Sequence, residues 1–307
     1  MLKIEGLQKQ YGTFQAVKGI DLHIEAGAIF GLIGPNGAGK TTTMKMIATL
    51  LRPTAGKIVM GEIDVTRRPE EARRRMGYMP DFFGVYDDLK VSEYMEFYGD
   101  CHRVPRAGRE RLIGDLLELV NLSHKKDAYV DGLSRGMKQR LCLARCLIHD
   151  PELLILDEPA SGLDPRARVE MREILQELRR MGKTILISSH ILAELAEICT
   201  DIGIVADGRL SVSGPVGQVL RRAGARLIEV RVAGDPAEAA IRAGQLPGLS
   251  SVQQTEHGLR IELDGEDEAV AQLLAGLVGA GVPVIHFAEL QSKLEEVFMA
   301  VTGGEAK

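Results

Sequence analysis

A glycine-rich loop between an apolar run and a helical segment is the strongest constraint on the fold. The run Ala28–Ile33 carries no charge, which is typical of a buried strand. The next residues, Gly34-Pro35-Asn36-Gly37-Ala38-Gly39-Lys40-Thr41, fit the pattern G-x-x-x-x-G-K-[ST], and we expect a helix to begin near Lys40. The glycines let several backbone N–H groups face one anion, and the helix adds the positive end of its dipole. The sequence therefore predicts a phosphate-binding loop.

Further apolar runs alternate with amphipathic segments along the first two thirds of the chain. Strands are expected over 2–33 in several short pieces, and over 153–156, 184–188 and 202–205. Helices are expected over 92–99 and 109–121, after Ser134 and around 171–178. Such alternation predicts an α/β fold with a parallel core sheet, whose chemistry gathers at the carboxyl ends of the strands.

The pattern changes near residue 224, where the phosphate motifs end. The expected order is strand (226–232), helix (235–243), strand (249–254), strand (258–264), helix (267–279) and strand (283–288). This β-α-β-β-α-β order indicates a small α+β module of the ferredoxin-like type. We therefore expect domains at 1–222 and 225–307, with a helical subdomain at about 88–150 in the first.

Composition narrows the class of protein. The net charge of −5 gives no support to a nucleic-acid surface, and four cysteines without a CxxC pair favour reduced thiols in the cytosol. The N-terminus lacks the features of a secretion signal. The uncharged stretch 269–287 is nearly long enough to span a membrane, but its glycines and Pro283 favour a helix, a turn and a strand.

Two adjacent carboxylates follow the run Leu153–Leu156. Asp157 is placed to hold the shell of a Mg²⁺ ion together with the Thr41 hydroxyl, and Glu158 suits a general base that polarises the attacking water. His190 follows the next strand and is placed to bond a γ-phosphate. A capping acid in a loop and an incidental surface histidine are the alternatives for Glu158 and His190.

The octapeptide Leu133-Ser134-Arg135-Gly136-Met137-Lys138-Gln139-Arg140 completes the set of motifs. Ser134 stands where a helix N-cap would stand, and Gly136 allows its N–H to approach an anion closely. With the phosphate loop, Asp157-Glu158 and His190 in this order, residues 1–220 resemble the ATP-binding subunits of the ABC transporter superfamily.

The resemblance implies a P-loop NTPase fold of the ABC type, with N-terminal antiparallel strands. It also implies that Tyr11 stacks on adenine, that Val17 packs nearby, and that Ser134 and Gly136 bind the γ-phosphate of ATP held by the opposite subunit. Asp157 and Glu158 would be the Walker B aspartate and the catalytic base, Asp164 would belong to the dimer-crossing loop, and His190 would be the switch histidine. The phosphate loop would comprise Gly34, Asn36, Gly37, Ala38, Gly39, Lys40, Thr41 and Thr42.

Two departures from the family pattern are visible. Arg135 and Met137 replace glycine and glutamine of the usual Leu-Ser-Gly-Gly-Gln, and Arg135 either adds a charge at the phosphate or is solvated. Asp81 stands where the family usually has a glutamine that meets Mg²⁺. It could reach the metal through water, or it could be a simple turn aspartate.

The C-terminal module, with the segments 84–89 and 294–298, resembles the ATPase subunits of multidrug and daunorubicin-type exporters. The resemblance implies a homodimer with two shared ATP sites, Mg²⁺ as cofactor, and a separate transmembrane permease subunit, but no nucleic-acid partner. It implies a peripheral protein on the cytoplasmic face of the bacterial-type plasma membrane, docked through 92–121. The alternatives are a soluble ABC-type ATPase acting on ribosomes or DNA, and a P-loop small-molecule kinase.

Overall fold

A computed structural model of the chain describes residues 1–82, 84, 88–222, 226–263, 267–290, 294 and 298. They form two compact units, Met1–Pro215 and Val216–Lys307. The domain limits expected from the sequence, 1–222 and 225–307, stay a prediction about which segments fold on their own.

The central sheet of the first unit has the strand order β10-β9-β3-β8-β7-β6. All neighbours are parallel except β10, which runs antiparallel to β9 at one edge. Four of the strands, β3, β7, β8 and most of β9, are buried on both faces, as their uninterrupted apolar sequences predicted. The strands are β3 (Ile29–Ile33), β6 (Met76–Met79), β7 (Leu153–Asp157), β8 (Thr184–Ser188), β9 (Asp201–Ala206) and β10 (Arg209–Pro215).

A second, antiparallel sheet in the order β2-β1-β4-β5 covers one face of the central sheet. Its strands are β1 (Leu2–Tyr11), β2 (Phe14–Ile24), β4 (Ala55–Met60) and β5 (Ile63–Asp64). One continuous hydrophobic core joins this sheet, the central sheet and α1 (Lys40–Ile47), for example through Ile4, Met44 and Leu186. The N-terminal antiparallel strands and the helix start at Lys40 are thus confirmed.

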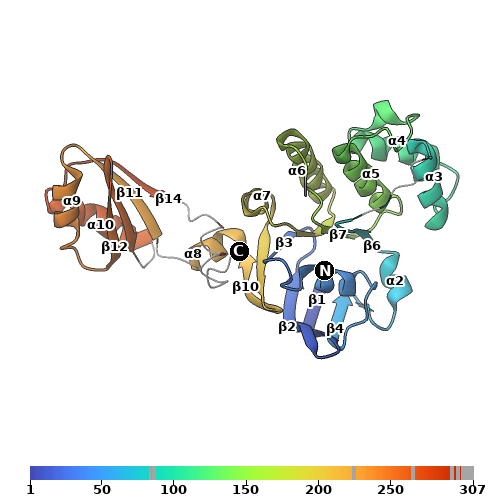
Figure 1. Cartoon of the computed structure of the whole chain (residues 1–307), viewed down its shortest axis with the longest axis horizontal. Coiled ribbons are helices and arrows are strands. Elements are labelled where there is room, and N and C mark those ends of the chain that lie inside the picture. The colour runs from blue at the N-terminus through green and yellow to red at the C-terminus, as the bar shows by residue number, and fades with distance from the viewer. Residues whose placement is uncertain are drawn as a thin grey trace. The chain divides into compact units, whose positions relative to one another are not determined.

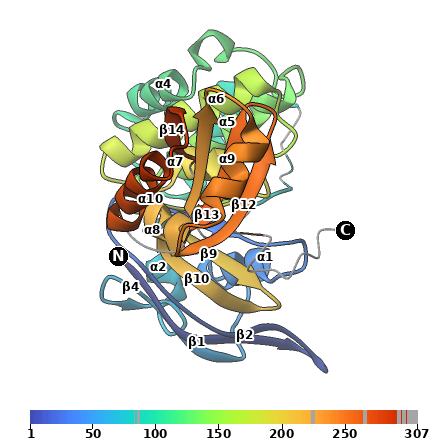
Figure 2. The ribbon, with the colours of Figure 1, turned by 90° about the vertical axis from the view of Figure 1, so that its left-hand side faces the viewer.

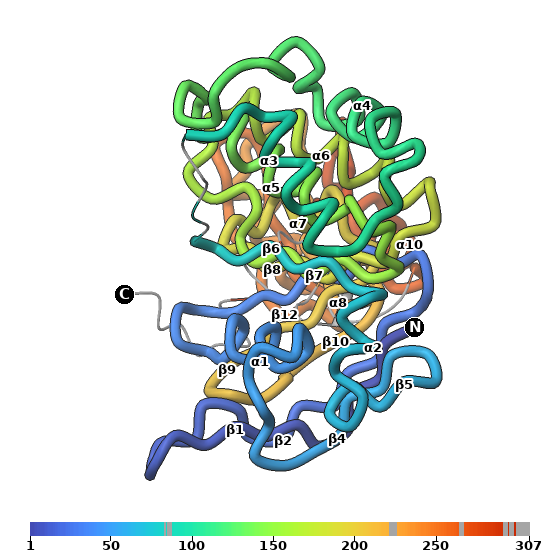
Figure 3. Tube along the Cα trace, turned by 90° about the vertical axis from the view of Figure 1, so that its right-hand side faces the viewer, coloured from blue at the N-terminus to red at the C-terminus, as the bar shows by residue number. Residues whose placement is uncertain are grey.

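The other face of the central sheet carries a group of helices. Figure 3 shows α1 on the side of β1 and β2, and α3 and α5 on the opposite side; Figure 2 agrees. The α5 helix packs on β6 and on α3 and α4, which form the helical part expected from the sequence. The remaining helices of this unit are α2 (Pro69–Arg73), α3 (Val91–Cys101), α4 (Arg109–Leu119), η1 (Ser123–Lys125), α5 (Arg135–Leu147), α6 (Pro165–Arg180) and α7 (Leu192–Ile198).

The second unit contains an antiparallel sheet in the order β12-β13-β11-β14, drawn in orange in Figure 1. From β11 onward the order of its elements is β-α-β-β-α-β, as expected, and its core lies between the sheet and two helices through residues such as Ile228, Ala243, Ile261 and Leu277. The uncharged stretch 269–287 is indeed divided between a helix and a strand. The elements are α8 (Val216–Arg222), β11 (Arg226–Val232), α9 (Pro236–Ala243), β12 (Leu249–Thr255), β13 (Gly258–Leu263), α10 (Asp267–Gly279) and β14 (Val284–Leu290).

Two segments used in the sequence comparison fall largely outside the described residues. Of 84–89 only Gly84, Asp88 and Leu89 are described, and of 294–298 only Leu294 and Phe298, both helical. In the described part of the chain, no helix has the length and apolar character needed to cross a membrane.

Candidate active site

The phosphate loop leaves β3 at Ile33 and returns into α1 at Lys40. Gly37 (φ 81°) and Gly39 (φ 103°) adopt the left-handed conformation that favours glycine. A Cβ on Gly39 would lie 2.7 Å from the carbonyl oxygen of Ala16, so this position excludes larger residues by contact as well. The loop therefore needs its glycines to take this shape.

The Lys40 side chain is folded back into the loop. Its ammonium donates hydrogen bonds to the carbonyl oxygens of Gly34 (2.6 Å) and Pro35 (3.1 Å), and the residue is 6% exposed. Burial lowers the pKa of Lys40, while the negative charges of Glu158 and Asp157 oppose that effect. A buried cation with few anionic neighbours is well suited to receive phosphate groups.

The turn between β9 and β10 fastens this loop to the β1–β2 hairpin. The N–H of Gly208 donates to the carbonyl of Ala38 (3.1 Å), and the N–H of Lys18 donates to the carbonyl of Gly208 (2.7 Å). Val17 is fully buried beside the loop. At the hairpin tip Tyr11 is 48% exposed, with the Lys9 ammonium 5.1 Å from its ring centre. The predicted adenine platform therefore has a fixed connection to the predicted phosphate site.

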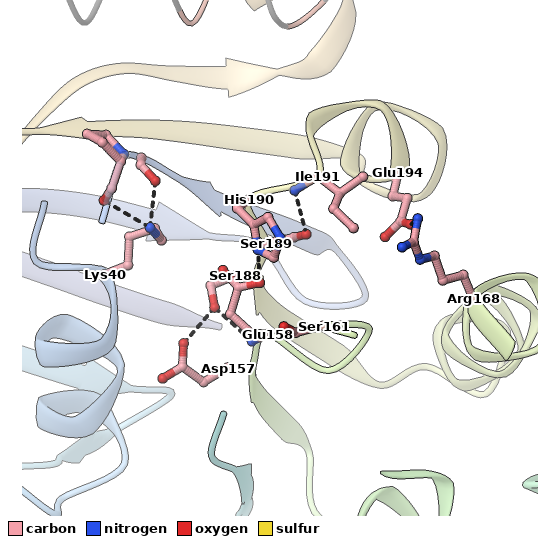
Figure 4. Close-up of polar contacts among 12 residues, drawn as sticks. Lys40, Asp157, Glu158, Ser161, Arg168, Ser188, Ser189, His190, Ile191 and Glu194 are labelled. Atoms are coloured by element: carbon pink, nitrogen blue, oxygen red, sulfur yellow. Dashed lines mark hydrogen bonds and ion pairs between the residues drawn. The ribbon is translucent and has the colours of Figure 1, made fainter. Parts of the chain in front are cut away.

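Three neighbouring strands, β3, β8 and β7, end at the same edge of the sheet. Asp157 lies opposite Ser188 in register, and the Ser188 hydroxyl donates to Asp157 Oδ1 (2.6 Å). The same hydroxyl accepts from the backbone N–H of Glu158 (3.0 Å). Figure 4 shows Asp157, Glu158, Ser188 and His190 gathered near Lys40. The residues expected to share a site are thus brought together, and we call Lys40, Asp157, Glu158 and His190 the acceptor half.

Glu158 has a φ of 52°, which is uncommon for a residue with a side chain. Its Oε2 is 2.7 Å from Nδ1 of His190, and its side chain is 14% exposed against 57% for the histidine. Backbone strain of this kind persists where the surroundings hold it, and it clusters at functional sites. The N–H of Glu158 donates to the Ser188 hydroxyl, which supports the backbone, and the contact with His190 Nδ1 orients the carboxylate.

The donors around Asp157 fit a divalent cation. Asp157 is 1% exposed, yet its Oδ2 has no hydrogen-bond partner. Thr41, in the first turn of α1, presents an exposed side chain. No group of three or more His, Cys, Asp or Glu side chains in the described residues could hold a metal alone. A Mg²⁺ ion here would accordingly be shared between few protein oxygens and the phosphates of a nucleotide.

The octapeptide and the loop before α6 form a second cluster. Ser134 caps α5, where its hydroxyl accepts from the N–H of Met137 (3.3 Å), and Asp164 caps α6, where its carboxylate accepts from the N–H of Ala167 (2.9 Å). Ser134, Gly136 and Asp164 line one open groove, whose described lining includes none of the phosphate-loop residues. We call these three residues the donor half.

Arg135 does not extend away from the protein. A Cβ on Gly162 would lie 2.5 Å from the Arg135 guanidinium, so this side chain lies against the backbone of the loop before α6. Gln139, one turn further along α5, donates to the carbonyl of Ser161 (3.1 Å). Arg135 was expected either to add a charge at the phosphate or to be solvated. Neither alternative included this contact, which links α5 to the loop 161–164 within one chain.

Asp81 follows β6, the neighbour of β7, by two residues and is exposed. It lies at the edge of the sheet that carries the acceptor half, and its contact with a metal stays a prediction. Ser188 is the residue to which sequence reasoning gave no role of its own. Its place after the run Thr184–Ile187 was a signal, because a hydroxyl at the end of a parallel strand can face a carboxylate at the end of the next strand.

Two protein-family models match the chain. The family model described as "ABC transporter" matches residues 17–161, and the model described as "ATP-binding protein DrrA1-3-like, C-terminal domain" matches 214–302. Nod factor export ATP-binding protein I of Rhizobium meliloti is 36% identical over 315 residues, covering 100% of this chain and 89% of its own length. The protein of the same name from Ralstonia nicotianae is 34% identical over 308 residues, covering 100% and 95%.

Solved structures match about seven tenths of the chain. An ATP-binding subunit of an ABC transporter, 30% identical, has a TM-score of 0.66 and covers 72% of this chain and 92% of its own. A dimeric ATP-binding cassette bound to ADP and Pi has a TM-score of 0.64 over 70% of this chain and 99% of its own. At 24% identity, the second match supports the fold alone.

Proposed function

Because the chain belongs to the family of ABC transporter ATP-binding subunits, we propose that two copies bind and hydrolyse ATP at shared sites and so drive a separate membrane-spanning subunit. The acceptor half of one copy and the donor half of the other would form each site. The supporting observation is that Ser134, Gly136 and Asp164 line a groove whose described lining includes no residue of the acceptor half. Closure on ATP and opening after hydrolysis would transmit the work.

Each residue of the acceptor half has a defined task in this proposal. Lys40 and the N-terminus of α1 bind the β- and γ-phosphates, and Tyr11 stacks on adenine. Glu158 accepts the proton of the attacking water, while His190 holds its carboxylate and Ser188 holds its backbone N–H. Asp157, Thr41 and, through water, Asp81 would hold Mg²⁺, which when bound neutralises charge on the phosphates.

The donor half would supply the missing groups from the partner copy. Ser134 and Gly136 begin α5, so a hydroxyl, backbone N–H groups and the positive end of a helix dipole face outward together. Asp164 caps α6 in the same groove and would lie at the dimer contact.

The membrane partner would be a separate permease subunit, with the protein held at the cytoplasmic face of the membrane. Three exposed aromatic side chains of the segment between β6 and α5 are available for such docking: Phe82 is 89% exposed, Tyr129 58% and Phe97 42%. The names of the relatives from Rhizobium meliloti and Ralstonia nicotianae favour export as the direction of transport.

The decisive experiment replaces the proposed base. Glu158→Gln should bind ATP as the unchanged protein does, release phosphate at least about 100-fold more slowly, and remain a dimer in ATP and Mg²⁺. Phosphate release and size-exclusion chromatography with ATP measure the two effects. The amide keeps the shape of the side chain but cannot accept the proton.

Glu152→Gln is the matched control, because Glu152 precedes the opposite end of β7 and its side chain is 54% exposed. Normal phosphate release by Glu158→Gln would remove the proposed role of Glu158. A phosphorylated small molecule as product, in place of free phosphate, would favour a kinase.

A further inference from the structure

The helix that follows His190 is incompletely packed. The inner side of α7 packs on β3 through the fully buried Leu195. Its side toward α6 borders an apolar cavity of about 230 Å³, lined by Pro159, Val169 and Ala193 among others. Val169 is 42% exposed, so this pocket opens to solvent, and the apolar side chains that line it make few contacts across it. Apolar packing therefore leaves the position of α7 relative to α6, and with it the start of α7 near His190, only partly determined.

Two ion pairs span the gap between α6 and α7. Arg168 Nη1 is 3.4 Å from Glu194 Oε1, and one turn further from His190 Arg172 pairs with Glu197. Glu194 is 25% exposed, whereas Glu197 is 58% exposed. Because solvent screens exposed pairs, the pair nearer to His190 has the larger effect on position.

Arg168 makes a second contact besides its ion pair with Glu194. Its Nε donates to the carbonyl oxygen of Leu163 (3.0 Å), the residue before the cap of α6. One guanidinium thus joins the loop 161–164 to Glu194 of α7, which lies four residues after His190. Figure 4 shows Arg168 and Glu194 facing each other beside the loop that carries Ser189 and His190.

The charge of Glu194 also matters to the active site. Burial raises the pKa of Glu194, and the positive charges of Arg168, His190 and Arg172 oppose this, in that order, while Glu158 adds to it. Glu194 therefore lies within electrostatic reach of both His190 and Glu158. Without Arg168, its carboxylate would lose the largest of the positive charges that offset its burial.

We propose that Arg168 is a positioning residue for His190, holding α7 against the loop 161–164 so that the imidazole stays on the Glu158 carboxylate. This inference rests on the proposed function of Glu158 and His190. In this proposal the pocket between α6 and α7 leaves room for α7 to move, and the Arg168–Glu194 pair limits that movement.

Steady-state ATPase kinetics of the full chain test the proposal. Arg168→Met and Glu194→Gln should each lower kcat about tenfold and leave the KM for ATP within about twofold, because neither side chain belongs to the nucleotide cradle. The double variant should be no slower than either single variant, since both remove one link. Arg172→Met, which breaks the neighbouring pair between the same helices, should change kcat by less than about twofold.

Arg168→Lys keeps a cation that can pair with Glu194 but lacks the Nε–H that bonds the Leu163 carbonyl, so it should recover only part of the lost kcat. Equal losses in Arg168→Met and Arg172→Met, multiplying effects at 168 and 194, or no recovery with lysine would each overturn the proposal. If Glu158→Gln hydrolyses ATP normally, the proposed function fails instead. If Glu158→Gln is inactive but Arg168→Met is normal, only the positioning role fails.

Discussion

The acceptor half and the donor half are built in opposite ways. Lys40 and Asp157 are 6% and 1% exposed; Lys40 bonds the Gly34 carbonyl within the phosphate loop, and Asp157 bonds Ser188 on the neighbouring strand. Ser134 and Asp164 are exposed, and each caps the helix that follows it. One half is complete as a polar cluster within a single chain, whereas the other presents helix N-termini toward solvent. Under the proposed function, affinity for nucleotide would be set within one chain, and turnover would require a second copy.

The largest expected effect comes from mixing two variants, one altered in the acceptor half and the other in the donor half. Lys40→Ala removes the phosphate-binding cation, and Ser134→Asp keeps a good helix cap while placing a negative charge at the phosphate. Each variant alone should lack ATPase activity. An equal mixture should recover up to about a quarter of the activity of the unchanged protein, because half of the dimers would have one intact site. Phosphate release by the mixture measures the recovery.

A second mixture serves as the control. Lys40→Ala and Glu158→Gln both damage the acceptor half, so their mixed dimers contain no intact site and should remain inactive. An inactive first mixture in which mixed dimers are detected would show that the two halves do not meet across the dimer.

The next prediction concerns the acceptor half alone. Ser188→Ala should lower kcat about tenfold, because Asp157 Oδ1 and the Glu158 N–H both lose a partner. It should also lower the free energy of unfolding by about 1–3 kcal/mol, the usual cost of unpaired buried polar groups. Kinetics and urea denaturation measure the two effects.

Thr184→Val is the matched control for Ser188→Ala. The Thr184 hydroxyl is buried at the opposite end of β8, where it accepts from the N–H of Gly27 (3.0 Å). Its loss should reduce stability by a similar amount with little effect on kcat. If both variants reduce kcat alike, the Ser188 hydroxyl only stabilises the sheet.

The sequence predicted the acceptor half well because its elements are buried on both faces. Strands such as Leu153–Asp157 are runs of apolar residues, a pattern typical of strands buried on both faces. The parallel order of these strands places Lys40, Asp157 and His190 at one edge of the sheet. The strands β4 and β10 gave no comparable signal, because β4 begins with three exposed residues and β10 alternates between exposed and half-buried positions.

Contacts between side chains far apart in the sequence could not be predicted in the same way. The dual role of Ser188 depends on the register between β7 and β8, and the role of Arg168 depends on how α6 approaches α7. From the sequence, Arg135 was interpreted only as a departure from the usual residues of the octapeptide. Its contact with Gly162 depends on a loop 27 residues away, whose backbone conformation no local pattern specifies.

The smallest expected effect tests how firmly that contact holds the donor half. Gly162 has a φ of 69°, so Gly162→Ala should lower the free energy of unfolding by about 1 kcal/mol through backbone strain. A further cost below about 1 kcal/mol should come from displacing the Arg135 guanidinium, since the end of a flexible side chain moves at small cost. Urea denaturation measures the sum.

Gly182→Ala separates the two terms, because Gly182 has a similar φ of 86° and no atom lies within 4 Å of an added Cβ. Gly162→Ala should therefore be more destabilising than Gly182→Ala, and the two should become equal when Arg135 is also replaced by alanine. Equal costs in the presence of Arg135 would mean that its guanidinium is not held against the loop. The exposed donor half would then depend on its helix caps alone, which would widen the difference between the two halves.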